Sequence, residues 1–504
     1  RHVPRCSFLF QQKATFDPAS RGNTGHSFAD YLLGESRRSE RALGIANTQF
    51  RATFFYMYFE DTWRLSPRLT LNLGIRYENS PPWYDKYRGI MNVQMFDPGV
   101  TGGGAYPQVD PNTRAPVFVR PGEGDFHQGI GYHFSDDIPK AVGNDILGRS
   151  LIRRDNNDLA PRIGLAYSPS NNWTIRTGFG MFYTQDTGNP RFDMGRHLGA
   201  RGRVDSDDER PNSNLRNPWA AEAASASCSN WSGPCLTRPY VLGNIAGRRT
   251  PYVLQYMFNV QRQLTNSIAL EAGYLGNQGR KLERLRAYNE AVSRTGPNDN
   301  RSILERTPWP MFGRIQQVDG SVISNYNALN LKLQQRFTKG LTYLVGFTWS
   351  KAIDNGSAIR TNAGDRLFPP NSYDLQSERG LSQFHTGRRF VASVLYDLPF
   401  GRGREINLDN PVVNAVFGGW RLGSILTFSD GTPINVGGIG DRNNTGVANW
   451  PNATGISPVP TDRRANRFWP AEEFDPTNPG LTYSSARSAG TYSSHRESVT
   501  GTSR

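Results

Sequence analysis

The chain has 504 residues, of which 37% are hydrophobic, a mean hydropathy of −0.59 and a formal net charge of +14. It contains no run of 18 or more apolar residues, which excludes membrane-spanning helices, but strand-built membrane proteins stay compatible because half of each spanning strand is polar. Its arginines form no block or known binding motif, so we expect no nucleic-acid partner.

The first clear element is a hairpin over residues 54–79. Its second half alternates strictly, with apolar residues at the odd positions 69–77 and polar or small residues at the even positions 70–78. A period of two over this length predicts a strand with one apolar and one polar face. The pattern does not say which face is inside.

Four further hairpins follow along the chain and show the same alternation. They cover residues 159–183, 252–276, 325–351 and 388–428, the last crossing a looser segment at 399–418. Ten strands are therefore predicted, and a composition of 12% aromatic residues with 52 glycines and 33 prolines suits strands with long loops. The fold class we expect is all-β.

The connections alternate in length. Turns within the first four hairpins are short, whereas long loops are expected at 80–158, 184–250, 277–324 and 352–387. A soluble sandwich does not require this rhythm, but an antiparallel up-and-down transmembrane β-barrel has short periplasmic turns and long extracellular loops. Strands of about 9 to 11 residues also suit a tilted crossing of the membrane.

In a membrane barrel the apolar rows face lipid and the polar rows face the lumen. Candidate lipid-facing residues in the first hairpin are Leu69, Leu71, Leu73 and Ile75. Candidate lumen-facing residues are Arg76, Glu78, Arg176, Gln255, Asn259, Glu271, Lys332, Gln334, Arg336, Asp397 and Arg421.

The sequence offers little reactive chemistry. Cys228 and Cys235 could form a small loop disulfide or stay free thiols, and too few ligands surround them for a metal site. His127 and His133 match no standard metal spacing, and neither glycine-rich piece is a phosphate loop. We expect no catalytic site, no cofactor and no metal, and therefore not an enzyme.

Several segments together resemble a known family. They are EDTWRLSPRLTLNLGIRYE, LAPRIGLAYSP, PYVLQYMFNVQRQL with EAGYLGNQGRKL, SNYNALNLKLQQRFTKGLTYLVGFTWSKAIDN, RRFVASVLYDLPFGRGR and GGWRLGSILTFSDGTPINV. In this order, over residues 28–436, they resemble the barrel of Oar-like (OmpA-related) TonB-dependent receptors. The resemblance implies a Gram-negative outer-membrane transporter, whose 22-stranded barrel encloses an N-terminal plug coupled to the TonB complex through a TonB box.

The sequence departs from that family at both ends. We find no plug domain or TonB box, and residues 437–504 are predicted to be a loop or a disordered C-terminal segment. Residues 1–436 are therefore expected to form a partial barrel of about 10 to 12 strands, as a fragment of a receptor or a truncated product, with its gap between the first and last strands. A smaller closed barrel is the alternative.

The resemblance implies TonB-dependent uptake of a ligand across the outer membrane. Its partners would be outer-membrane lipid, the TonB complex through a plug not present in this chain, and an unknown small-molecule, glycan or peptide ligand. A passive porin-like channel and a soluble surface glycan-binding β-protein are the alternatives.

Overall fold

The computed structural model describes residues 48–94, 116–143, 148–186, 241–292, 299–359 and 371–434, with shorter stretches between 7 and 42, between 188 and 239, at 369 and at 492–493. The predicted C-terminal segment 437–504 lies outside the described residues except for that last pair. In the described part of the chain, no helix is long and apolar enough to cross a membrane.

Ten of the 12 strands of the main sheet are long and form one continuous path. They are β4 (Phe55–Ser66), β5 (Leu69–Asn79), β11 (Asp158–Ser170), β12 (Trp173–Tyr183), β16 (Tyr252–Gln263), β17 (Ile268–Ala287), β18 (Ile315–Thr338), β19 (Leu341–Asp354), β21 (Arg388–Asp397) and β22 (Arg421–Ser429). Each corresponds to one strand of the five predicted hairpins.

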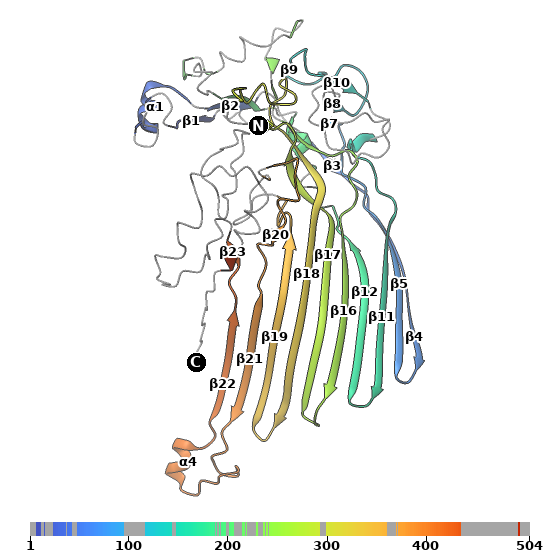
Figure 1. Cartoon of the computed structure of the whole chain (residues 1–504), viewed down its shortest axis with the longest axis vertical. Coiled ribbons are helices and arrows are strands. Elements are labelled where there is room, and N and C mark those ends of the chain that lie inside the picture. The colour runs from blue at the N-terminus through green and yellow to red at the C-terminus, as the bar shows by residue number, and fades with distance from the viewer. Residues whose placement is uncertain are drawn as a thin grey trace.

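The sheet is antiparallel and follows the chain order without a crossover along these ten strands, from β4 at one edge to β22 at the other (Figure 1). β4 and β22 do not pair with each other, so the sheet is open. The all-β antiparallel up-and-down fold is confirmed, and the opening lies between the first and last strands, as expected.

Short turns join the strands at one end of this wall, which is the lower end in Figure 1. The β18–β19 turn needs two left-handed residues, Lys339 (φ 49°) and Gly340 (φ 78°). A side chain on Gly340 would also meet the Asp397 carbonyl oxygen at 2.7 Å, so glycine is required there. The fifth turn is longer and contains the helix α4 (Pro411–Phe417).

Two strands are longer than the sequence suggested. The loop expected at 277–324 is strand at both of its ends, because β17 continues to Ala287 and β18 begins at Ile315. Beyond residue 280 their side chains are polar or buried on both faces, so the alternation that marks a half-exposed strand disappears. These extensions carry the wall into a folded region at its upper end (Figure 1).

The expected long loops 80–158 and 184–250 are not merely polar connections. Their described parts pack with the extensions of β17 and β18 into a folded cap, which we define as the described residues of 80–157, 184–250, 288–314 and 355–387. Its main hydrophobic core includes Val93, Phe118, Tyr132, Phe134 and Phe312. The cap gives the wall a structured end rather than a fringe of loops.

Short elements complete the cap and the termini. They are β1 (Ser7–Leu9), α1 (Ser27–Leu33), β2 (Arg38–Ala42), β3 (Phe50–Arg51), β6 (Tyr84–Asp85), β7 (Asn92–Gln94), β8 (Val117–Arg120), β9 (His133–Phe134), β10 (Lys140–Val142), η2 (Gly148–Ser150), η3 (Asp193–His197), β13 (Arg201–Asp205), β14 (Cys235–Leu236), β15 (Val241–Asn244), β20 (Gly380–Leu381), β23 (Pro433–Ile434) and β24 (Tyr492–Ser493). β15 pairs in parallel with the start of β18, which ties the cap to the wall.

Candidate functional site

Cross-strand pairing shows how the predicted lumen residues of different strands lie relative to one another. Residues that pair directly on antiparallel strands share a face. Arg76 pairs with Ala160. Further along the same face of β11, Ala166 pairs with Arg176, which in turn pairs with Asn259. The same rule links Gln261 to Glu271 and on to Lys332. The predicted lumen residues of the paired rungs therefore share one face, which is mainly polar but also carries Met257, Leu275 and Ile425.

Some of these residues contact each other. Arg76 forms an ion pair with Glu78, which is buried. Asn259 donates a hydrogen bond to Glu271 at 2.8 Å, and the Lys332 ammonium lies 4.0 Å from the same carboxylate. Around Glu271, these contacts join polar side chains of three neighbouring strands, β16, β17 and β18.

The others have different surroundings. Arg421 forms an ion pair with Asp397 near the short-turn end of the wall. Arg176 donates to Gln261 at 3.2 Å, a residue that the sequence analysis did not single out. Among the side chains the structure describes, no hydrogen bond or ion pair joins Gln255, Gln334 or Arg336 to another predicted lumen residue. The polar row is therefore a set of local pairs rather than one network.

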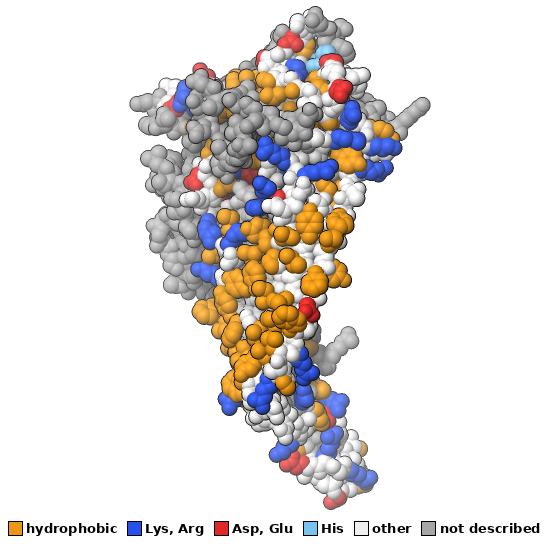
Figure 2. Space-filling model, turned by 90° about the vertical axis from the view of Figure 1, so that its right-hand side faces the viewer, with side chains coloured by type: hydrophobic (Ala, Val, Ile, Leu, Met, Phe, Trp, Pro, Cys, Tyr) orange, Lys and Arg blue, Asp and Glu red, His pale blue; other side chains and the backbone are white. Residues whose placement is uncertain are grey.

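The opposite face is apolar along the middle of the strands. Leu71 pairs with Trp63 and Leu165, and Leu69, Leu73 and Ile75 lie in the same row. Ile75 is 47% exposed, and the edge strand β4 places one charged residue on this face, Asp61 opposite Leu73. Figure 2 shows hydrophobic side chains gathered in a band over the strand region, with charged side chains above and below it. Such a band is what a strand-built wall would present to lipid.

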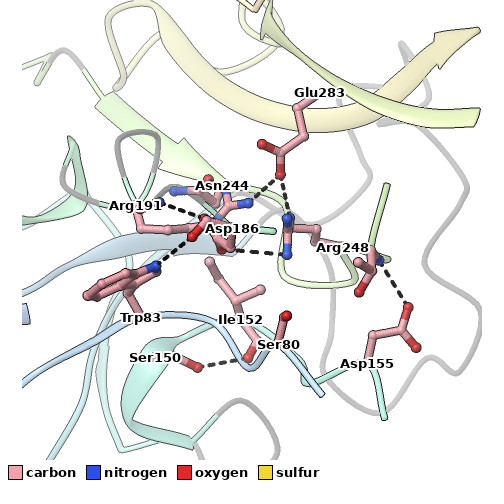
Figure 3. Close-up of polar contacts among 12 residues, drawn as sticks. Ser80, Trp83, Ser150, Ile152, Asp155, Asp186, Arg191, Asn244, Arg248 and Glu283 are labelled. Atoms are coloured by element: carbon pink, nitrogen blue, oxygen red, sulfur yellow. Dashed lines mark hydrogen bonds and ion pairs between the residues drawn. The ribbon is translucent and has the colours of Figure 1, made fainter. Parts of the chain in front are cut away.

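At the junction of cap and wall lies a cluster of buried charges, which we call the cap-wall network (Figure 3). Arg191 is fully buried, and its guanidinium binds Asp186 at 3.0 Å and also Asn244 and Glu283. Arg248 binds Glu283 and lies 3.7 Å from Asp186. Since Glu283 belongs to β17 while the other four residues belong to the cap, the network fastens the cap to the wall.

The charges of the network are balanced. Burial alone would raise the pKa of the Asp186 carboxyl, but the charges of Arg191 and Arg248 outweigh it and hold that pKa below its usual value. Two carboxylates face two guanidinium groups, so no net charge is buried. No sequence pattern predicts this cluster, because its members lie in segments that were expected to be solvated loops.

A second buried pair anchors the strand extensions. Arg286 of β17 binds Asp319 of β18 at 2.7 Å, and the hydroxyl of Tyr288 donates to the same carboxylate at 2.9 Å. Arg286 also donates to the carbonyl oxygen of Ser372. The segment around 372 is thereby fixed to the wall as well.

His127 of the cap accepts a hydrogen bond that requires its imidazole to be neutral. Its Nε2 accepts the backbone N–H of Phe134 at 3.2 Å, and its ring stacks on His133 with centroids 3.9 Å apart. Burial, followed by the charges of His133 and Lys140, lowers the pKa of His127 to about 4. The folded cap therefore keeps this imidazole neutral.

We expect cap stability to fall as the pH drops from about 6.5 to about 4. Above this range His127 is neutral in both the folded and unfolded chain, whereas within it only the unfolded chain takes up the proton. Hydrogen exchange of cap amides at pH 7.5 and 5 measures the effect. His127→Gln, whose amide oxygen can still accept the Phe134 bond, should reduce the dependence; an equal dependence in that variant would contradict the role of His127.

Cys228 and Cys235 are joined by a disulfide in the cap. Near it, the Ser229 backbone and hydroxyl both donate to Asp136, at 2.8 and 2.7 Å. In the described part of the chain, no group of three or more His, Cys, Asp or Glu side chains is placed to hold a metal ion. The arrangement offers a wall with two unlike faces and a stabilised cap, rather than a reaction centre.

Comparison with known proteins gives one strong match. A family described as the outer membrane beta barrel domain matches residues 2–503. No curated protein matches the chain.

Solved structures give weaker likenesses. The chain is similar to the FrpB iron transporter from Neisseria meningitidis (F3-3 variant), with 12% identity and a TM-score of 0.32 over 84% of this chain and 38% of that one. It is similar to the outer membrane transporter YddB from Escherichia coli, with 9% identity and a TM-score of 0.35 over 82% and 42%. For the siderophore receptor PiuA from Acinetobacter baumannii the values are 10% and 0.33 over 79% and 35%. The chain spans less than half the length of each, and only the family match carries an argument.

Proposed function

The chain belongs to the outer membrane beta barrel domain family, and from this premise we propose that it forms part of the wall and the extracellular cap of a TonB-dependent receptor that takes up a ligand. The family places the chain in the outer membrane of a Gram-negative cell. A soluble glycan-binding protein is therefore no longer an alternative. The observation that supports the proposal is the ten-strand sheet with one polar and one apolar face, short turns at one end and a folded cap at the other.

In this proposal the apolar face meets lipid and the polar face lines the lumen. A lipid-facing side chain finds no water to solvate a charge, whereas a lumen-facing one does. Leu69, Leu71, Leu73 and Ile75 then contact acyl chains. The polar face, from Arg76 to Arg421, lines the route or holds a plug by hydrogen bonds and ion pairs.

In this proposal the cap captures the ligand. Recognition by loops works best when a rigid scaffold positions them, and the cap-wall network provides that rigidity. The ligand class we propose is a small molecule, a glycan or a peptide. Energy would come from the TonB complex through a plug, and the ordered Oar-like segments of the sequence support this choice of receptor subtype. We assign the chain no catalytic role.

The two faces can be told apart by labelling. In the full-length protein in lipid vesicles, a cysteine at Lys332 should react with a water-soluble maleimide, whereas a cysteine at the neighbouring Leu331 should not. Leu331 is 38% exposed and Lys332 is 46% exposed, so burial within the protein would not explain a lack of reaction at position 331. Equal labelling at both positions would contradict the face assignment.

A passive porin-like channel is the second candidate, and it shares the wall. Planar-bilayer conductance separates the two, because a plugged receptor should stay closed while an open pore conducts steadily. We expect no steady conductance from the full-length protein. Steady conductance, together with uptake that persists when the proton gradient is dissipated, would favour the passive channel.

A further inference from the structure

The apolar face of the wall ends, on its cap side, in a polar and basic cluster that membrane spanning alone does not explain. We call it the rim; it consists of Gln278, Arg280, Lys281, Asn325, Asn327 and Lys351. Cross-strand pairing places Gln278 beside Asn325 and Asn327 beside Lys351, on the same face as the rows of Leu331 and Phe347. The rim is therefore continuous with the apolar band.

The rim is organised by its own hydrogen bonds. The Arg280 guanidinium donates to the carbonyl oxygens of Gly279 and Ser324, to the Gln278 side chain at 2.6 Å and to that of Asn325 at 3.1 Å. Four of its five N–H groups are thus used inside the protein. Arg280 therefore acts as a positioning residue that fixes both amide side chains.

Two tyrosine hydroxyl groups continue these hydrogen bonds toward the apolar band. Gln278 donates its amide to the Tyr256 hydroxyl at 3.2 Å, and the Tyr274 hydroxyl donates to Asn327 at 2.7 Å. Tyrosines with an apolar ring and a polar tip suit the boundary between acyl chains and headgroups. The rim therefore lies where the apolar environment ends.

The charge of the rim is positive. Lys281 and Lys351 are exposed, and the Lys281 ammonium lies 5.3 Å from the centre of the Tyr252 ring. Between the short turns and the rungs at Tyr252, Asn325 and Ile353, this face of strands β16 to β19 carries no carboxylate. The carboxylate that interacts electrostatically with Lys281, Asp158 of β11, is buried. Two flexible ammonium groups above an apolar surface favour a phosphate-bearing amphiphile.

We propose that the rim binds the phosphorylated headgroup of an outer-leaflet glycolipid. Its phosphates would accept hydrogen bonds from Lys281 and Lys351, and its acyl chains would lie on the rows of Leu331 and Phe347. The proposal rests on the proposed function, because it requires this face to meet lipid and the cap to be extracellular. It adds a specific lipid partner to a wall that otherwise needs only a generic bilayer.

The test measures binding of bisphosphorylated lipid A to the full-length protein in detergent by native mass spectrometry. The double variant Lys281→Gln/Lys351→Gln should bind the lipid about tenfold more weakly or worse, since each lysine contributes an ionic contact. Dephosphorylated lipid A should bind the unchanged protein equally weakly. The matched control is Lys332→Gln, which removes an exposed lysine from the opposite face of β18 and should leave binding unchanged.

The outcomes distinguish a failure of the glycolipid site from a failure of the proposed function. Unchanged binding in the double variant and in Lys332→Gln overturns the glycolipid site but leaves the face assignment, tested by labelling, standing. Weakened binding in Lys332→Gln alone reverses the faces and overturns the proposed function as well. Equal thermal unfolding of all variants in detergent shows that the fold is retained; if the double variant does not fold, the two single variants replace it.

Discussion

Replacing Leu331 with arginine is expected to destabilise the protein in a bilayer by about 2–4 kcal/mol. Leu331 lies at the centre of the apolar row of β18, between Leu329 and Leu333, and pairs with Ala272 and Phe347. Leu331 is 38% exposed, so the arginine side chain fits without a clash. The loss of stability therefore reflects the medium that surrounds this position. Urea unfolding of the full-length protein in phospholipid vesicles gives the free energy.

The matched control is Asn330→Arg, at the same depth on the opposite face. Asn330 accepts a hydrogen bond from the Thr348 hydroxyl at 2.9 Å, so this variant should lose only about 1 kcal/mol. Comparable losses for both variants in vesicles would mean that neither face is in lipid. A larger loss for Asn330→Arg would mean that the faces are reversed.

Arg191→Ala is expected to destabilise the cap by about 3–5 kcal/mol, the range for removing one partner of a buried ion pair. The change leaves Asp186 and Glu283 facing a single guanidinium, that of Arg248, and so buries an uncompensated negative charge. The strands of the wall keep their own ladders, so the loss should be local. Hydrogen exchange should show faster opening of amides in β15 and around Arg248 than in β12 or β19.

Arg301→Ala is the comparison for this second result. Arg301 is half-exposed and pairs with Asp299 two residues away, so its removal should leave the exchange of cap amides nearly unchanged. If Arg191→Ala exchanges no faster than Arg301→Ala, the network does not hold the cap. If amides of the whole wall exchange faster together, cap and wall unfold as one unit.

These two results bear on function at different points. The first concerns the medium in which the wall folds, and the second concerns the rigidity of the part proposed to capture ligand. A loose cap with an intact wall should weaken ligand capture without weakening membrane insertion.

The sequence by itself determined the wall. Strand geometry sends successive side chains to opposite faces, so the alternation from Leu69 to Glu78 was enough to predict β5, and each hairpin turn lies close in sequence to the strands it joins. Within a hairpin, the short turn then predicts that the two strands it joins pair with each other. The same local rule explains why the predicted polar residues of separate hairpins share one face.

Only the tertiary structure decided the cap. Its contacts join residues far apart in the chain, such as Gln317 with the Val93 carbonyl oxygen at 2.6 Å across 224 positions. Arg191 and Glu283 look like solvated charges in the sequence, and burial with each other is what gives them a structural role. The extensions of β17 and β18 were missed for the same reason: once both faces of a strand are covered, the period of two that reveals it is no longer imposed by solvent.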